Sequence, residues 1–150
     1  MTAFVTTGAG FLLAVLWFDL MFDVQTLRPR GRELPEEILA SIAGYYGRVT
    51  TAARPMNRLI AAVMLATVAA IAVQIAEGDV RAWVGWASLG LAGAAVALAA
   101  AHTVPAAVRL GKRRDTAEVQ SRLARSILRD HLLCLGAIAA LLTLQLALAS

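Results

Sequence analysis

The sequence is poor in charged residues and contains a single cysteine. Only 16% of its 150 residues are charged, whereas 59% are hydrophobic; a soluble domain of this size carries roughly a quarter charged residues. The composition therefore points to a lipid bilayer rather than water as the solvent. Cys134 cannot form a disulfide within the chain, and its apolar surroundings favour a small buried side chain. No Cys-x-x-Cys pair and no Cys/His spacing typical of zinc sites is present.

Lysine and arginine are absent from the first 27 residues. A cleavable signal peptide begins with a basic segment, so we expect a permanent first membrane span instead. Of the fourteen basic residues, six lie between positions 28 and 58 and seven between 109 and 129, which leaves only Arg81 elsewhere. These segments flank apolar stretches, so the positive-inside rule explains them better than nucleic-acid binding does.

Four apolar stretches are each about long enough to cross a bilayer, which takes ~20 helical residues. We expect spans over residues 3–24, 59–75, 82–101 and 132–149. This pattern predicts an all-α membrane protein, a single domain over residues 1–150 with four transmembrane helices in an antiparallel bundle. The charge distribution places both basic segments in the cytoplasm and both termini outside, in the inner (plasma) membrane.

Both basic segments also carry helical patterns, which predict cytoplasmic helical extensions. In the first, Pro35 followed by two glutamates favours a helix start. A stripe then recurs at Ile38, Ile42, Tyr45 and Val49, as in an amphipathic helix at or below the membrane surface. Pro55 is expected to kink or interrupt the chain before the second span.

The second segment predicts that the fourth helix begins below the membrane. Asp115 and Glu118 have the spacing of a capping box, with Asp115 as the cap. Val119, Leu123 and Ile127 then form a stripe that runs toward the last span.

For the spans themselves, we expect close helix contacts at small residues and interhelical hydrogen bonds from two glutamines. These residues are Gly8, Gly10, Gly85, Gly90 and Gly93, and Gln74 and Gln145.

Polar residues gather at the cytoplasmic end of every span. Asp19 and Asp23 lie four residues apart on one helix face, with Asp19 about one turn inside the hydrocarbon. An ionised carboxylate facing lipid there costs ~2.5 kcal/mol or more, so Asp19 should face the bundle. The other candidates at the same depth are His102, His131, Asn57, Arg58 and Arg129.

Three interpretations of this polar layer stay open. Asp19 could form a structural ion pair with Arg58 or Arg129, or the layer could relay a proton or cation. Alternatively, Asp19, Asp23, His102 and His131 could hold a divalent metal. No tight ligand motif such as His-Glu-x-x-His supports the metal. Two histidines that flank a loop at the membrane edge suit haem poorly, so no cofactor is identified.

The layout resembles several families of small four-helix membrane proteins. A first span leads through Tyr45-Tyr46-Gly47-Arg48 and Pro55 into the second span, and a basic segment, Arg122 to His131, leads into the fourth. This plan is similar to the DUF4149/TMEM205-like, DUF1772 (anthrone-oxygenase-like) and HemJ/CopD-like groups. Trp17-Phe18-Asp19 is similar to the end of the first span in HemJ-like proteins. That family has a haem-associated histidine in this span, whereas the present chain has none.

These observations leave three functional hypotheses. The first is a module that binds or conducts a proton, cation or small ligand through the Asp/His layer. The second, which the resemblance implies, is a membrane oxidoreductase acting on a lipid, quinone or porphyrin-like substrate. The third is an accessory subunit of a larger membrane complex. The expected partners are the bilayer, anionic headgroups at the cytoplasmic face, and a second copy of the chain or a larger complex, with no nucleic acid.

Overall fold

The protein is helical throughout the part of the chain that the computed structural model describes, residues 1–52 and 54–148, which contains no β-strand. Four helices are long and two connect them, with short 3₁₀ and π turns at their ends. In chain order the elements are α1 (Thr2–Asp23), η1 (Val24–Leu27), α2 (Glu36–Gly47), η2 (Arg48–Ala52), α3 (Arg54–Glu77), α4 (Ala82–Leu98), η3 (Ala99–Thr103), α5 (Val104–Gly111) and α6 (Ala117–Leu148).

Four helical segments are long and apolar enough to cross a membrane, as the sequence predicts. They cover Thr2–Leu27, Pro55–Glu77, Ala82–Gly111 and Ala117–Ala147. All four are longer than the predicted spans, because the helices extend through the neighbouring polar residues. The predicted end of the fourth span, at residue 149, lies outside the described residues. The prediction of an all-α, multi-pass membrane protein is therefore confirmed.

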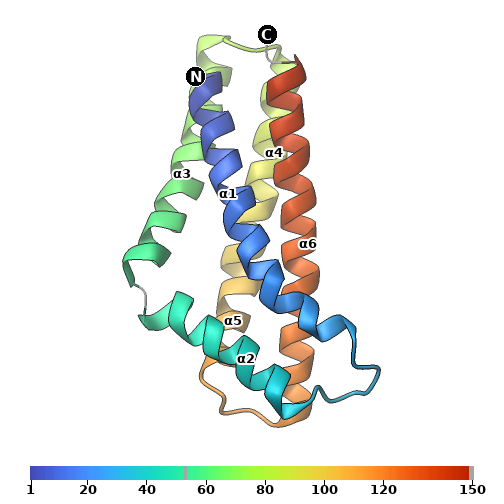
Figure 1. Ribbon diagram of the computed structural model, residues 1–150. Coiled ribbons are helices and arrows are strands. Elements are labelled where there is room, and N and C mark those ends of the chain that lie inside the picture. Colours follow the sequence, from blue (N-terminus) through green and yellow to red (C-terminus); the bar gives the residue numbers. More distant parts are fainter. Residues whose placement is uncertain (53, 149–150) are drawn as a thin grey trace.

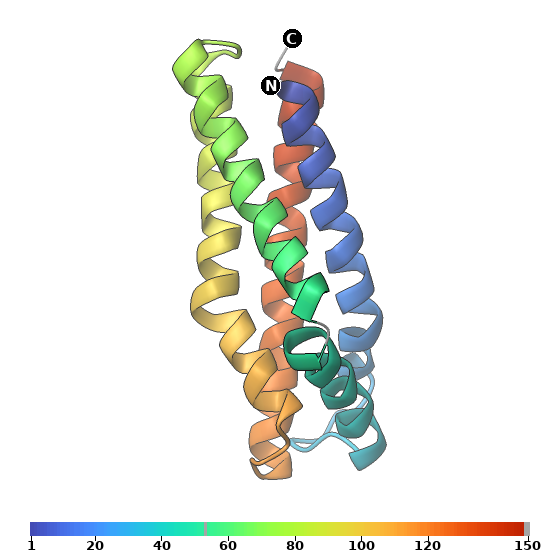
Figure 2. The same ribbon diagram turned by 90° about the vertical axis from the view of Figure 1, so that its left-hand side faces the viewer.

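The long helices α1, α3, α4 and α6 lie side by side (Figures 1 and 2). Helix α6 packs against α1 and α4, and α3 packs against the same two helices. The start of α1, the α3–α4 connection and the end of α6 share one end of the molecule (Figure 1). The core between the helices is apolar, and large side chains such as Phe4, Leu65, Trp86 and Leu146 point outward. Outward apolar side chains are what a lipid environment requires.

Only two of the five predicted glycines lie at close helix contacts. A side chain at Gly8 would collide with Thr67 of α3, and one at Gly85 would collide with Ile75. A Cβ added at Gly10, Gly90 or Gly93 meets nothing within 4 Å, so the packing role expected of these three was wrong. They occupy the outward faces of α1 and α4, which the sequence pattern alone does not separate from the inward faces.

A chain of buried hydrogen bonds joins the long helices near the end that holds the N-terminus. Gln74 donates to Thr2 Oγ1 at 3.1 Å and to Gln145 Oε1 at 3.1 Å, and Gln145 donates to Ser88 Oγ at 3.0 Å. All four helices contribute one member. The predicted interhelical role of both glutamines is confirmed.

Helices α4 and α5 form one continuous rod with a wide π turn between them. The backbone N–H of Val104 donates to the carbonyl of Ala99, five residues earlier. Pro105 follows directly and has no N–H to donate, so the preceding turn cannot keep regular α-helical bonding. The helix therefore continues past the predicted end of the third span at residue 101.

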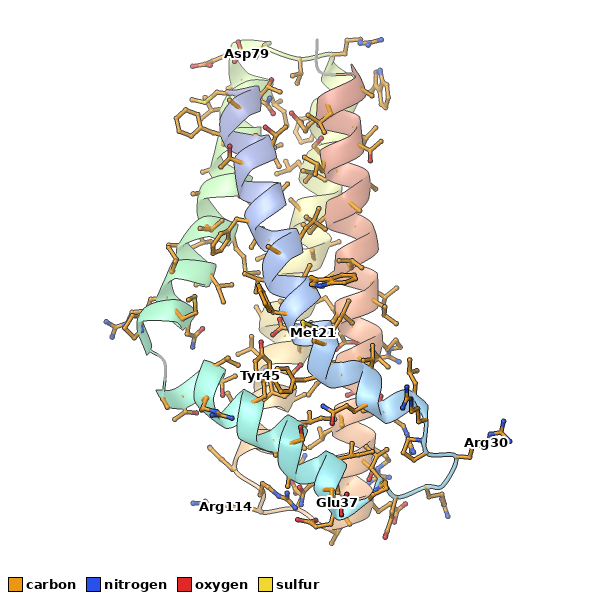
Figure 3. The ribbon with its side chains drawn as sticks, in the orientation of Figure 1. Met21, Arg30, Glu37, Tyr45, Asp79 and Arg114 are labelled. Carbon is orange, nitrogen blue, oxygen red and sulfur yellow. The ribbon has the colours of Figure 1, made fainter. Side chains whose placement is uncertain are left out.

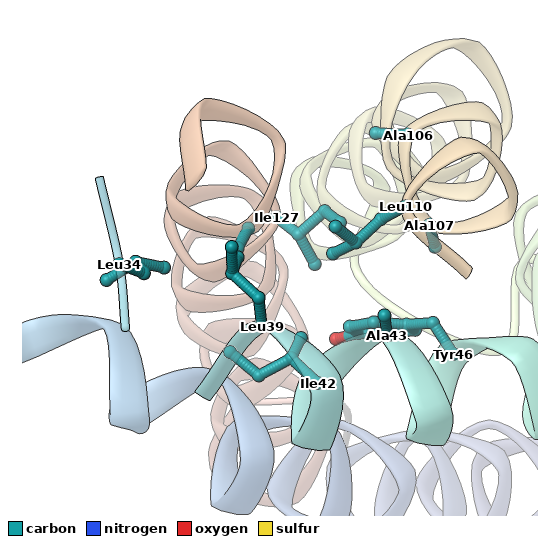
Figure 4. Packing of buried hydrophobic residues seen from close by; sticks show 10 residues of the cluster. Leu34, Leu39, Ile42, Ala43, Tyr46, Ala106, Ala107, Leu110 and Ile127 are labelled. Atoms are coloured by element: carbon teal, nitrogen blue, oxygen red, sulfur yellow. The ribbon is translucent and has the colours of Figure 1, made fainter. Parts of the chain in front are cut away.

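A second apolar cluster lies at the opposite end, where α2 crosses α5 and α6 (Figure 4). All four residues of the predicted stripe contact this cluster: Ile42 is fully buried in it, and Ile38, Tyr45 and Val49 are partly buried against it. The fully buried face also carries Leu39, Ala43 and Tyr46, so it is turned by about one residue from the predicted stripe. Besides this side-chain packing, α2 and α5 touch through their backbones: a Cβ on Gly111 would lie 2.8 Å from the backbone nitrogen of Gly47.

The long helix α6 starts at Ala117 and runs unbroken to Leu148. The predicted start was close, but its cap was misplaced by one residue. Thr116 precedes the helix, and its Oγ1 accepts the N–H of Val119 at 3.5 Å. Asp115 instead accepts two hydrogen bonds from Arg109, both 2.8 Å long. A cationic partner on α5 thus takes the carboxylate away from the helix end.

Candidate functional site

The candidate site forms where the end of α1 meets the middle of α6. Asp19 and Asp23 lie one helical turn apart on α1 and both face His131. The Asp23 carboxylate is fully buried, and its Oδ2 lies 2.7 Å from His131 Nδ1. Asp19 Oδ2 lies 3.8 Å from His131 Nε2. The imidazole therefore faces a carboxylate at each ring nitrogen.

Two tyrosines of α2 close this group from the other side. Tyr45 donates to Asp19 Oδ1 and Tyr46 donates to Asp23 Oδ1, each at 2.6 Å. Tyr45 lies on the side of α2 that faces α1 (Figure 3). Burial first, and then the hydrogen bond to Asp19, raise the pKa of Tyr45. Burial and the charge of Asp23 raise the pKa of Tyr46. Both phenols thus remain protonated hydrogen-bond donors at physiological pH.

Aromatic contacts fix the two tyrosines in place. The ring of Tyr45 stacks on Phe22 of α1, with centroids 4.1 Å apart and an interplanar angle of 10°. Tyr46 meets Tyr45 edge-on at 5.2 Å, and its hydroxyl also lies 3.4 Å from His131 Nδ1. Because α1, α2 and α6 each supply polar atoms, the cluster connects the long helices to the crossing helix α2.

A second acid–histidine pair lies one residue earlier on α6. Asp130 is fully buried, and its Oδ2 contacts His102 Nδ1 of η3 and accepts a hydrogen bond from Thr103 Oγ1 at 3.2 Å. Its other oxygen lies 3.4 Å from the guanidinium of Arg129. The side chain of His102 is 48% exposed, compared with 9% for His131. The π turn directs the neighbouring residues His102 and Thr103 to the same carboxylate oxygen.

The structure brings together only part of the predicted polar layer. Asp19, Asp23 and His131 meet, whereas His102 pairs with Asp130. Asn57, at the start of α3, donates to the carbonyl of Thr50 at 3.3 Å and takes no part in the cluster.

The partner expected for Asp19 also differs. Within the described residues neither Arg58, which is exposed, nor Arg129 contacts it; Tyr45 and His131 do. In the same residues, no group of three or more His, Cys, Asp and Glu side chains is arranged to hold a metal ion.

Sequence reasoning missed Asp130 and Thr103 of one group, and Tyr45 and Tyr46 of the other. Asp130 fell just before the expected fourth span and was grouped with the basic segment, although an acid beside His131 at membrane depth was a usable signal. The sequence pattern assigned Tyr45 to the apolar stripe of its helix and gave neither tyrosine a place in the polar layer. Their role depends on how α2 folds back on α1, and no local pattern in the sequence indicates that contact.

The fold and this cluster together define a class: an all-helical multi-pass membrane protein with an acid–histidine–tyrosine cluster between its long helices and a crossing helix. Comparisons with models of protein families, with characterised proteins and with solved structures found no match. The case for a function therefore depends on the geometry of the site.

Proposed function

We propose that the chain is an antiparallel four-helix protein of the plasma membrane with both termini outside. The charge distribution supports this orientation, because thirteen of the fourteen basic residues belong to two segments that join the helices at one end. Arg30 and Arg114 lie at that end and Asp79 lies at the other (Figure 3). A C-terminal reporter that is active only in the cytoplasm should be inactive. Strong reporter activity would overturn this topology.

We propose that the cluster around His131 binds a proton from the cytoplasm. The observation that carries this proposal is the imidazole with a carboxylate at each ring nitrogen, 2.7 Å and 3.8 Å away. When His131 Nδ1 donates to Asp23, Nε2 is the atom that gains or loses a proton opposite Asp19. At 3.8 Å a direct hydrogen bond is too long, so transfer to Asp19 needs a small side-chain rotation. Histidine suits this task because it titrates near neutral pH.

The geometry favours binding over conduction through one protomer. About 21 Å of helix separates His131 from Gln145 at 1.5 Å per residue. The buried α6 residues between them are Cys134, Ile138 and Leu141, within an apolar core. These α6 side chains carry no charge, and Thr67, buried at a similar depth on α3, donates to the carbonyl of Val63 in its own helix. We therefore infer that conduction across the membrane would require an oligomer. The site therefore serves the cytoplasmic side alone.

A bound proton changes how α2 is held. Tyr45 and Tyr46 donate to the two carboxylates that share His131. A hydrogen bond to an ionised acceptor is about twice as strong as one to a neutral acceptor. Once His131 passes its proton to Asp19, the hydrogen bond from Tyr45 weakens and α2 is held less firmly against α1. On this basis the protein reports cytoplasmic pH through the position of α2.

Nitrogen-15 NMR of the two histidine rings, with the protein in lipid nanodiscs, tests the proposal. The ring of His131 should gain and lose a proton over the pH range in which the protein stays folded. Asp19→Asn should move the midpoint of this change, because the Asp19 carboxylate faces His131 Nε2. Thr143→Val, at an exposed position of α6, is the matched control and should leave the midpoint unchanged. A His131 ring that does not titrate would refute proton binding.

A second function, that of an accessory subunit, is favoured by one specific observation. Helices α2 and α5 and the lower part of α6 share an apolar cluster of their own, separate from that of the long helices. A structured platform below the membrane suits the docking of a partner protein. Co-purification of a stoichiometric partner from membranes, lost on deletion of residues 36–47, would support this role. The oxidoreductase hypothesis and the family resemblance stay predictions.

A further inference from the structure

A shallow depression lies between α5 and α6, outside both acid–histidine pairs. It is lined by Arg109, Val119, Arg122, Leu123 and Ser126. Two guanidinium groups and two apolar side chains thus face one concave surface, beside the Ser126 hydroxyl, which donates to the carbonyl of Leu123 at 2.9 Å. This donor set matches a phosphate group that is joined to an apolar body.

The exposed face of α6 continues this surface toward the membrane. Arg122, Ser126 and Arg129 recur at i, i+4 and i+7, which places them on one side of the helix. Above them on the same side are Leu133 and Gly136, both exposed. A Cβ at Gly136 would meet nothing within 4 Å. Along this side of α6, the cationic residues at 122 and 129 are therefore followed, toward the C-terminus, by an exposed apolar strip at 133 and 136.

The depth of this surface matches the phosphate layer of a bilayer. Counted from Ala147, where the last candidate span ends, Arg129 lies about 27 Å along the helix and Arg122 about 38 Å. The hydrocarbon core is about 30 Å thick, and headgroups bring the total to about 40–45 Å. Arg129 and Arg122 therefore bracket the level of the phosphates.

We propose that this surface, formed by Arg109, Arg122, Ser126 and Arg129, binds the phosphate of an anionic phospholipid, with an acyl chain along Leu133 and Gly136. The proposal requires that α6 crosses the membrane but does not depend on proton binding. Basic pockets between membrane helices are known to suit anionic lipid headgroups.

The charges of the surface single out Arg122. Arg109 already binds Asp115 at 2.8 Å, and Arg129 lies 3.4 Å from Asp130. Among the described residues Arg122 makes no hydrogen bond or ion pair. Arg125, three residues further along α6, does not face this surface, because it donates to the carbonyls of Gly31 and Arg32. Arg122 thus supplies the uncompensated positive charge that an anionic headgroup requires.

Native mass spectrometry of the full-length protein, released from nanodiscs that contain equal phosphatidylglycerol and phosphatidylcholine, measures which lipid is retained. The wild type should retain phosphatidylglycerol selectively. Each lost arginine should lower that selectivity about fivefold, and R122Q/R129Q about 30-fold. R122Q alone removes an exposed side chain without a partner in the described residues, so it keeps the test available if the double variant does not fold.

The matched control is R30Q/R58Q, which removes the same charge at exposed positions that do not line this surface. It should retain the wild-type selectivity. Equal loss in both double variants would show only diffuse attraction to the membrane and overturn the site. Displacement of the lipid by millimolar inorganic phosphate would also overturn it, because it would identify the ligand as the free anion. Neither outcome touches the titration of His131, so the two proposals can fail separately.

Discussion

Two aspartate–histidine pairs meet on consecutive residues of α6, and they differ mainly in how far water reaches the histidine. In one pair α6 contributes His131, which is enclosed by Asp19, Asp23 and two tyrosines. In the other α6 contributes Asp130, and its partner His102 is about half exposed. The same two functional groups thus form one enclosed pair and one open pair. The enclosed pair depends on internal partners for its stability, whereas the open pair can be compensated by solvent.

The largest effect is expected when the enclosed pair is broken by Asp23→Ala. The substitution leaves His131 Nδ1 and the Tyr46 hydroxyl buried without their carboxylate. Loss of one partner from a buried ion pair typically costs about 3–5 kcal/mol of unfolding free energy. Denaturant unfolding in nanodiscs measures the loss. Asp79→Asn removes an exposed carboxylate 3.6 Å from the N-terminus and should cost less than about 1 kcal/mol.

A smaller effect is expected when the open pair is broken by Asp130→Ala. Thr103 loses one acceptor, but His102 can turn to water, so the cost should be about 1–3 kcal/mol. The freed imidazole should also react faster with a water-soluble histidine reagent, followed by peptide mapping. If Asp130→Ala costs as much as Asp23→Ala, exposure is not what separates the pairs.

The unfolding free energy at alkaline pH measures what Tyr45 and Tyr46 contribute to the enclosed pair. Because the pKa of both phenols is raised in the folded protein, their stabilisation is complete below the ordinary value of about 10 and declines as the pH rises above it. Each tyrosine should lower stability by up to about 1.4 kcal/mol per pH unit in that range. Tyr45→Phe/Tyr46→Phe should be less stable at neutral pH but lose less above pH ~10. Parallel slopes for both proteins would contradict this assignment.

The smallest effect is expected for a third pair, Arg109–Asp115, which lies at the surface and is partly exposed. Hydrogen bonds from Arg109 lower the pKa of Asp115, so its contribution is present at neutral pH and is lost as the pH falls below about 3.9. Asp115→Asn should shift the melting temperature less than Asp23→Ala or Asp130→Ala does. Its difference from the wild type should vanish in acid. A shift as large as that of Asp130→Ala would mean that this pair is not solvated.

The sequence was informative wherever one helix alone decides the outcome. Apolar length predicts the four spans, and the spacing of Asp19 and Asp23 predicts their shared face, because both follow from helix geometry. The apolar stripe of Val119, Leu123 and Ile127 also predicted that α6 begins near Asp115 and continues without a break into the last span. The exact cap was not, because Arg109 of another helix competes for the carboxylate.

Features that depend on contacts between distant helices were not predictable. The register of the buried face of α2 follows from its docking on α5 and α6, which also turns Tyr46 toward Asp23. Asp130 was overlooked because hydropathy places the span boundary after it, whereas in the structure it is fully buried. A polar residue at the edge of an apolar run can belong to either side, and only the packing of η3 against α6 decides.

The π turn at Ala99–Thr103 has a consequence for chain length rather than composition. A π turn holds one residue more than an α turn, so removing one alanine from residues 99–101 would convert it to a regular turn. The helices before and after the turn would keep their facing, because the wide turn absorbs the lost residue. Removing one residue from the regular helix α5 before Arg109 would instead rotate Arg109 by about 100° relative to α4. The α4–α5 rod therefore tolerates at the π turn a change of length that the regular helix beside it does not.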